Sequence, residues 1–450
     1  MLLDRLGRHP AVVGAAVWLV GALWFFRDPV FSGFDTITGD RGDARLIIFL
    51  HEHWWRVLQG EASWRSPAMF APAGDTLGYS DTFALDLVIF APLRLLGFDQ
   101  FIAFQLTRVA LTPIGFASLF TLMRRYLHLA LLPTCLLATA GVFANNVFVD
   151  TGHPQIYAIN IVSLVVLVFT AAWHSDDRRW RAGGSALGGL LVGLLLWSTF
   201  YFGWYTVFLG GLTLIALAIV TSIVDGVSTV VETIRRRWAM GVAAVAGLAV
   251  GLVPFFATYL PVLDDSDRRS YAEVAGLAPR PLDLINVGRH NVAWGWLVEP
   301  LLDGDERLDT LYRAVAPTPV LLITAAFAAV SLIAMTRSSS LVVTRIGAAL
   351  GIVTAVAVVM PVQFEFGGAW AWAHRFVPGA SALRLFGRIE IVASLMACLT
   401  IACWLSARST TGSVDESAEA ESTRPHAPTP RPLGALLIGV LALICLEQLN

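Results

Sequence analysis

The sequence contains no lysine, so all 31 of its basic residues are arginine. Charged residues of both signs make up only 14% of the 450 residues, whereas 56% are hydrophobic. One or two soluble cores cannot bury so large an apolar fraction, and several segments approach or exceed eighteen residues without a charge. The composition therefore excludes an ordinary soluble protein and predicts an all-α, polytopic integral membrane protein.

Cysteine is scarce, and the four cysteines (Cys135, Cys398, Cys403 and Cys445) all lie in apolar segments. We expect them to be small core residues, because no disulfide framework or metal-ligand spacing is present. The net charge is only -2, and no basic patch with interleaved aromatic residues indicates a nucleic-acid partner. The chain also lacks both glycine-rich phosphate-binding motifs, so nothing in it indicates a nucleotide site.

Apolar length predicts about eleven transmembrane helices. The first covers residues 10–26 and follows a short arginine-bearing stretch that resembles the start of a signal sequence. Because no convincing cleavage site follows, we expect an uncleaved first span. The other ten are residues 101–123, 126–149, 155–173, 186–202, 204–224, 240–262, 320–336, 341–362, 385–405 and 433–446.

Arginine placement predicts which loops share a side, since cytoplasmic loops retain arginines. Arginine-bearing turns are expected around residues 124–125, 178–181, 235–237 and 337–345. All four are cytoplasmic, together with the N-terminus, only if residues 82–97 do not cross the membrane. That segment contains Asp86, Pro92 and Arg94, so we expect it to lie at the interface. Residues 44–58 have an apolar and a polar face and predict an amphipathic helix, either interfacial or packed on protein.

This topology, in a cell inner (plasma) membrane, puts four segments outside the cell: residues 27–80, 150–154, 263–319 and 363–384. Residues 1–406 form one transmembrane region that includes two large outer loops, 27–80 and 263–319. Residues 407–432 are rich in Ser, Glu, Pro and Thr and predict a flexible cytoplasmic linker. Residues 433–450 contain the last span. Almost all candidate chemistry is therefore extracytoplasmic.

Three carboxylates, Asp35, Asp40 and Asp43, follow the first span closely. Gly39 and Gly42 flank Asp40 and would let the backbone approach a ligand. An ordinary solvated loop is the alternative interpretation, because acidic residues are common at a helix exit on the translocated side.

Three stretches carry a family resemblance: Phe34-Asp35-Thr36-Ile37-Thr38-Gly39-Asp40-Arg41-Gly42-Asp43, residues 68–72 with 77–81, and Asp150-Thr151-Gly152-His153-Pro154-Gln155. With one span before a long acidic outer loop, they resemble the GT-C superfamily of lipid-linked-sugar glycosyltransferases, most of all its bacterial YfhO-type integral membrane members. The likeness covers roughly the first half of the chain in detail. It implies an inverting glycosyltransferase that moves a hexosyl or pentosyl group from a polyprenyl-phosphate donor to an extracytoplasmic acceptor, such as a cell-envelope glycan, a lipid or a protein.

In that superfamily an acidic residue of the first outer loop acts as general base or orients the acceptor, and a second acid often follows in the next outer loop. The resemblance therefore implies Asp40, Asp43 or Asp35, in that order, as the catalytic residue, and Asp150 as the second acid. A carboxylate is suited to this role because it can remove the proton of an acceptor hydroxyl. The candidate substrate-binding residues are His153, Gln155, Tyr79 and Asp81, with a structural hydrogen-bonding role as the alternative for His153.

A departing polyprenyl phosphate needs cationic partners, and here only arginine can supply guanidinium donors. Arg384 and Arg388 are four residues apart near the outer end of a predicted span, so we expect them to share a helix face and hold the donor phosphate. Arg375 and His374 would extend this patch. The alternatives are that Arg384 reaches the interface and that Arg388 pairs with a nearby glutamate.

The expected partners are the lipid-linked donor, the acceptor and the lipid bilayer. No cofactor is certain, and a divalent cation, Mg²⁺ or Mn²⁺, is left open. A transporter or flippase of lipid-linked sugars is a competing function, but it predicts repeated halves and ionisable residues near mid-membrane, and neither is evident. A non-catalytic membrane scaffold subunit is the third alternative.

Overall fold

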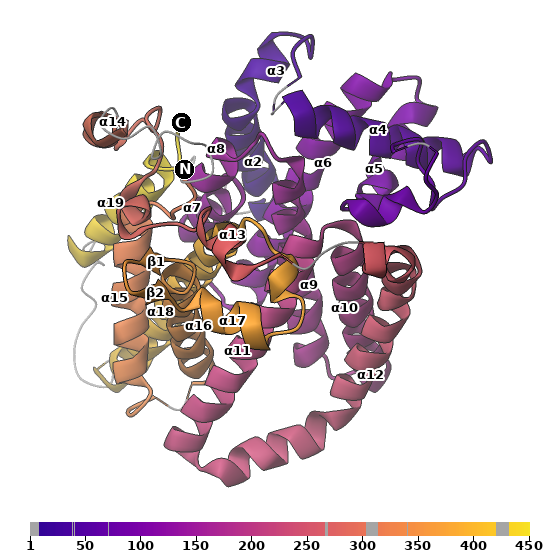
Figure 1. The fold of residues 1–450 in the computed structure, drawn as a ribbon. Helices are drawn as coiled ribbons and strands as arrows, with labels where there is room; N and C mark the ends of the chain where they lie inside the picture. Colours follow the sequence, from indigo (N-terminus) through magenta and orange to yellow (C-terminus); the bar gives the residue numbers. More distant parts are fainter. Residues whose placement is uncertain are drawn as a thin grey trace.

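The computed structural model describes residues 9–37, 39, 41–70, 72–265, 269–302, 314–339, 341–419 and 432–450. These residues are almost entirely helical (Figure 1). The described exception is a short antiparallel pair of strands, β1 (Gln363–Phe364) and β2 (Gly367–Gly368). The predicted all-α class is confirmed.

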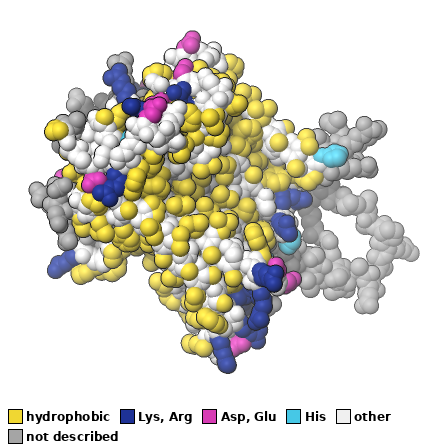
Figure 2. Space-filling view, turned by 90° about the vertical axis from the view of Figure 1, so that its right-hand side faces the viewer, with side chains coloured by type: hydrophobic (Ala, Val, Ile, Leu, Met, Phe, Trp, Pro, Cys, Tyr) yellow, Lys and Arg dark blue, Asp and Glu magenta, His cyan; other side chains and the backbone are white. Residues whose placement is uncertain are grey.

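Eight helical segments in the described ranges are long and apolar enough to cross a membrane, and three shorter helices are similarly apolar. Together they coincide with the eleven predicted spans. Figure 2 shows a broad hydrophobic surface between charged side chains near the upper and lower ends, as expected for a polytopic membrane protein. The helices are α2 (Pro10–Phe25), α6 (Gln100–Thr121), α7 (Leu131–Val142) with α8 (Asn145–Val149), α9 (Ile159–His174), α10 (Arg178–Ser198), α11 (Phe200–Asp225), α12 (Val227–Tyr259), α15 (Pro319–Met335), α16 (Val342–Val359), α18 (Ile389–Glu419) and α19 (Pro432–Leu446).

Several predicted boundaries are wrong because polar residues continue the helices. Helix α10 begins at Arg178, where the carboxylate of Asp177 caps it by accepting a hydrogen bond from Arg179 N. Residues 178–181 and 235–237 are therefore helical instead of forming turns, in keeping with the high helix propensity of arginine. Helix α18 likewise continues to Glu419, so the first part of the predicted linker 407–432 is helical. Residues 420–431 lie outside the described residues.

Helices α10 and α12 pack closely through glycine. A side chain at Gly189 would lie 1.9 Å from Ala244 O, and one at Gly247 would lie 1.9 Å from Ala186 O. Small residues spaced four apart, such as Gly247 and Gly251, allow this approach, which is a common basis of helix association in membranes.

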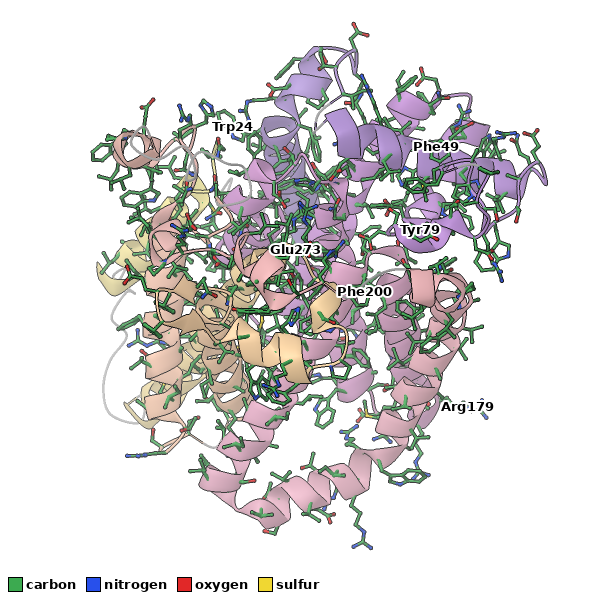
Figure 3. All side chains as sticks on the ribbon, viewed as in Figure 1. Trp24, Phe49, Tyr79, Arg179, Phe200 and Glu273 are labelled. Carbon is green, nitrogen blue, oxygen red and sulfur yellow. The ribbon has the colours of Figure 1, made fainter. Side chains whose placement is uncertain are left out.

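The chain runs back and forth so that its long loops gather at one end of the helix bundle, which we call the loop end. Three hydrogen bonds illustrate this arrangement: Gln105 Nε2 to Phe34 O at 3.0 Å, Tyr259 Oη to Ser80 O at 3.0 Å, and Gln363 N to Pro279 O at 2.7 Å. At the opposite end, Arg345 pairs with Asp225 at 2.8 Å. In Figure 3, Tyr79 and Phe200 lie nearer the loop end, whereas Arg179 lies much lower.

Residues 82–97 do not cross the bundle, as predicted. They form a 3-10 turn, η2 (Ala84–Asp86), and the nine-residue helix α5 (Leu87–Leu95). Nine residues span about 14 Å, less than half of a bilayer core about 30 Å thick. Residues 44–58 belong to the predicted amphipathic helix, α4 (Arg41–Leu58). The remaining loop-end helices are α3 (Arg27–Phe31), η1 (Thr76–Tyr79), η4 (Pro154–Ala158), η5 (Leu260–Asp265), α13 (Tyr271–Ala275), η6 (Pro281–Ile285), α14 (Gly295–Leu302), α17 (Trp370–Phe376), η8 (Ala380–Ala382) and η9 (Phe386–Arg388).

Candidate functional site

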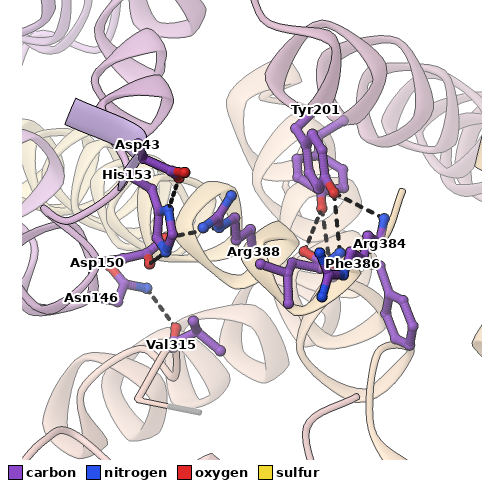
Figure 4. Close-up of polar contacts among 11 residues, drawn as sticks. Asp43, Asn146, Asp150, His153, Tyr201, Val315, Arg384, Phe386 and Arg388 are labelled. Carbon is purple, nitrogen blue, oxygen red and sulfur yellow. Dashed lines mark hydrogen bonds and ion pairs between the residues drawn. The ribbon is translucent and has the colours of Figure 1, made fainter. Parts of the chain in front are cut away.

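Four ionisable side chains from three distant segments meet at the loop end (Figure 4). Asp43 comes from the first turn of α4, Asp150 and His153 come from the turn between α8 and η4, and Arg388 directly precedes α18. We call these four residues the Asp–His–Arg network. It contains two of the predicted catalytic aspartates, one predicted phosphate-binding arginine and one predicted substrate-binding histidine.

Asp43 and His153 form the accessible part of the network. His153 Nδ1 contacts Asp43 Oδ2, and because a carboxylate only accepts hydrogen bonds, the Nδ1–H donates. This hydrogen bond is the largest cause of the lowered pKa of Asp43, and the charge of Arg388 acts in the same direction. The Asp43 side chain is 42% exposed. Asp43 is therefore an ionised carboxylate that an incoming molecule can reach.

Asp150 and Arg388 form the buried part of the network. Arg388 Nε lies 2.9 Å from Asp150 Oδ2, and the two side chains are only 4% and 2% exposed. Burial raises the pKa of Asp150, while the neighbouring Arg388 and His153 oppose that shift. His153 Nε2 lies 3.7 Å from Asp150 Oδ1, so the histidine stands between the two carboxylates. The alternative interpretation, in which Arg388 pairs with a nearby glutamate, is wrong, because Asp150 is its partner.

Asn146 joins the elements that carry this buried pair. Its amide Nδ2 donates to Val315 O at 2.9 Å, Glu390 O at 3.2 Å and Ser394 Oγ at 3.0 Å. These bonds tie α8, which carries Asp150 at its end, to the first turns of α18, which follow Arg388. A buried amide with several partners fixes the relative position of the elements that it joins.

Tyrosines of α11 fix the segment before Arg388. Tyr201 Oη accepts hydrogen bonds from Arg384 N at 2.9 Å and Leu385 N at 3.1 Å. Tyr205 Oη donates to Phe386 O at 3.2 Å. The guanidinium carbon of Arg388 lies 5.8 Å from the centroid of the Tyr201 ring, within range of a cation–π contact.

A small pocket opens beside the Asp150–Arg388 pair. Its lining residues are Asp150, Leu277, Val315, Leu385, Gly387 and Arg388. Among the described residues, Arg388 Nη2 is buried and has no hydrogen-bond partner. A buried guanidinium nitrogen without a partner is costly, so Nη2 retains the capacity to donate a hydrogen bond to an anionic oxygen.

Asp81 lies near this site but makes a different contact. Its carboxylate accepts a hydrogen bond from Phe200 N, at the start of α11, at 2.9 Å. Desolvation raises the pKa of Asp81 to about 6, although the Phe200 N–H and the charge of Arg388 oppose the shift. Asp81 therefore anchors the first loop to α11, and it titrates close to neutral pH.

The predicted arginine patch is not arranged as expected. Arg384 and Arg388 do not share a helix face, because α18 begins only at Ile389 and Arg384 precedes the 3-10 turn η9. Arg384 is exposed at the rim of the site, whereas Arg388 is buried. Arg375 is exposed and lies over the Phe376 ring, and no contact in the described residues joins it to the network.

Four other predicted residues lie outside the network. His374 stacks edge-on against Tyr271, with ring centroids 5.5 Å apart. Tyr79 is exposed and packs against Phe70. Gln155 is half-buried, and its Oε1 has no partner among the described residues. Asp35 is exposed, and its carboxylate has no ion pair in the described part of the chain.

Asp40, the first-ranked catalytic residue, lies outside the described residues. Among the described aspartates of this loop, Asp43 reaches the turn that follows Asp150 through its contact with His153. In the part of the chain that the structure describes, no three His, Cys, Asp or Glu side chains are grouped to hold a metal ion.

The sequence reasoning missed Asn146 and Tyr201. Two adjacent asparagines, Asn145 and Asn146, interrupt an otherwise apolar segment, and such residues are rarely tolerated there without partners. That signal could have drawn attention to Asn146. Nothing distinguishes Tyr201 in an aromatic-rich stretch.

The chain matches no protein-family model, no curated protein and no solved structure.

Proposed function

We propose that this protein is an inverting glycosyltransferase of the GT-C type, which transfers a sugar from a polyprenyl-phosphate donor to an acceptor hydroxyl. The observation that carries the proposal is the Asp–His–Arg network, in which an accessible carboxylate, Asp43, lies near a buried arginine. Such a transfer needs a base for the acceptor and a cation for the leaving phosphate, and the network supplies both.

Asp43 is the proposed general base. It is ionised at neutral pH, because His153 holds its pKa below the usual value, and it is partly exposed. It accepts the proton of the acceptor hydroxyl while the hydroxyl oxygen attacks the anomeric carbon. The bond from that carbon to the donor phosphate breaks in the same step, so a single displacement inverts the anomeric configuration. The dissociated polyprenyl phosphate carries the negative charge away.

Arg388 is the proposed phosphate-binding residue. Asp150 neutralises and orients one edge of the guanidinium, and Nη2 remains to donate to a phosphate oxygen. A fixed donor of this kind stabilises charge that develops on the leaving group. Arg384, exposed at the rim, would meet the same phosphate as it enters or leaves.

The proposed topology has eleven spans, a cytoplasmic N-terminus and an extracytoplasmic site. It is supported by the gathering of the described parts of the four predicted outer loops at the loop end, away from most of the arginine clusters. A site on the outside has no access to soluble nucleotide sugars, which favours a donor delivered through the lipid phase.

The test is transfer of labelled sugar by the purified protein, using a panel of polyprenyl-phosphate hexoses and pentoses with lipid extracts as acceptors. Asp43→Asn and Arg388→Gln are each expected to lower the turnover rate by about 100-fold or more, since removal of a general base or an oxyanion donor costs this much. Asp35→Asn removes an exposed aspartate of the same loop and serves as the matched control. If folded Asp43→Asn protein kept the full rate, or if Asp35→Asn lost as much, Asp43 would not be the base.

A transporter of lipid-linked sugars would behave differently. It would move the labelled donor across a vesicle membrane without forming a new glycosidic bond. Analysis of the labelled products therefore separates the two functions.

A further inference from the structure

The first part of α12, residues 227–238, is an exposed helix that the proposed transfer reaction does not use. Figure 1 shows it running across the lower end of the bundle before α12 turns upward. Apart from Val230 and Arg237, every residue from 227 to 239 is exposed. We call residues 227–238 the surface helix.

The surface helix has one apolar face that nothing in the described chain covers. Val227, Val231, Ile234 and Trp238 recur at helical spacing, and their exposed fractions are 65%, 57%, 62% and 64%. The same segment contains Glu232 and three consecutive arginines, so it cannot lie in the hydrocarbon core of a bilayer. An apolar stripe beside charged residues is typical of a helix that lies in the membrane surface.

The three arginines are placed differently around this stripe. Successive helical residues are about 100° apart, so Arg235 and Arg237 flank the stripe on its two sides and Arg236 lies opposite to it. Arg236 Nε pairs with Glu232 Oε1 at 2.6 Å, so its charge is locally neutralised. Arg237 lies over the ring of Trp173, at the end of α9, with its guanidinium carbon 4.8 Å from the centroid. Neither Arg235 nor Arg237 has an ion pair among the described residues.

We propose that the surface helix binds acidic phospholipids in the leaflet opposite to the candidate site. The apolar stripe enters the boundary of the acyl chains, while Arg235 and Arg237 hold anionic headgroups on either side of it. Charge complementarity favours this occupant, because the two flanking arginines carry net positive charge at the depth of the headgroups, where such residues attract anionic lipid.

The test compares two double variants that carry the same number of substitutions. Binding of phosphatidylglycerol and of phosphatidylcholine to the detergent-purified protein is titrated by native mass spectrometry. Wild type is expected to prefer phosphatidylglycerol. Arg235→Gln/Arg237→Gln should bind it about 25-fold more weakly, since each arginine contributes about fivefold at an anionic surface. The control Glu232→Gln/Arg236→Gln removes a neutral pair and should stay within about twofold of wild type.

Equal affinity of wild type for the two lipids, or equal loss in the two double variants, would overturn the proposal. A spin label attached at Val231→Cys tests the same proposal if the arginine double variant does not fold. In nanodiscs containing phosphatidylglycerol this label should collide with oxygen dissolved in the membrane more than with a water-soluble nickel chelate. The reverse order would show that the apolar stripe faces water or a protein partner. Neither readout depends on the proposed sugar transfer.

Discussion

The acidity of Asp43 depends mainly on one neighbour. Its carboxylate accepts a hydrogen bond from His153, which is the first cause of its lowered pKa, and partial desolvation works in the opposite direction. Without His153, desolvation would dominate and the pKa of Asp43 would rise. His153 therefore positions and tunes the proposed base.

His153→Ala is expected to move the acid limb of the pH–rate profile to higher pH. In wild type, Asp43 titrates below the ordinary value of 3.8, so the base stays ionised down to acidic pH. In the variant, the Asp43 carboxylate becomes protonated at a higher pH, so activity is lost at a higher pH. The measurement is sugar transfer from pH 3 to 8 for both proteins, so that the series begins below the ordinary pKa of an aspartate. An acid limb that does not move would contradict the assignment of Asp43 as the base.

Asp81 is expected to make stability depend on pH in the opposite sense from Asp43. Its pKa is raised to about 6 in the folded protein, above the value of 3.8 that applies when it is exposed. The folded state therefore binds this proton more tightly than the unfolded state does. The contribution of Asp81 to stability is full below about pH 4, declines as the pH rises through 6, and is constant above that.

Asp81→Asn should remove this dependence. The measurement is the thermal unfolding midpoint in detergent from pH 4 to 7, in which the variant should show a flatter profile than wild type. Asp35→Asn, an exposed aspartate of the same loop, provides the control and should follow wild type. An unchanged slope in Asp81→Asn would mean that Asp81 does not titrate in this range.

At the scale of helices, the contact between α10 and α12 depends on glycine. Gly247→Val would place a side chain against the backbone of Ala186, so the two helices would have to separate. Overpacking of this kind costs about 1–3 kcal/mol. Gly241 lies in the same helix, and a side chain added there meets no atom within 4 Å. Gly241→Val therefore changes the helix propensity in the same way without creating a clash.

We therefore expect Gly247→Val to lower the thermal unfolding midpoint, whereas Gly241→Val should leave it almost unchanged. The measurement is tryptophan fluorescence of both variants in detergent. Equal effects of the two substitutions would show that propensity, and not packing, determines the result.

Helices were predictable from the sequence, and their ends were not. Apolar length predicts where the apolar helices lie, because a helix that crosses a bilayer needs such a length. Hydropathy and arginine placement predict a turn at residues 235–237, although these arginines lie within α12. Composition predicts that a linker begins at residue 407, although α18 continues past that residue. Polar residues can extend a helix beyond the hydrophobic zone, and hydropathy carries no information about where such an extension stops.

At the scale of the whole molecule, the gathering of the loops makes a prediction about sidedness. Ser80 lies at the loop end and Ser338 follows α15 at the opposite end. In intact cells, Ser80→Cys should react with a membrane-impermeant maleimide and Ser338→Cys should react only after permeabilisation. Cys135, Cys398 and Cys403 are buried, and the parent protein gives the background signal. Labelling of Ser338→Cys from outside would contradict an extracytoplasmic site.

The candidate site was only partly predictable, because residues far apart in the sequence form it. Aspartates in the first loop and arginines late in the chain could each be selected by their chemical type. Nothing in a single sequence shows that Asp150 pairs with Arg388, or that His153 bridges two carboxylates. Those contacts depend on how α8, α11 and α18 pack, and spacing along the chain does not encode that packing.

The distance along the chain between Asp43 and Arg388 also has a consequence for biosynthesis. Asp43 and the turn that holds Asp150 and His153 enter the membrane early, whereas Arg388 is made after most of the chain. A growing polypeptide therefore lacks this cation until residue 388 has been made. The Asp–His–Arg network therefore forms only after the residues that begin α18 have been made and have packed against α8.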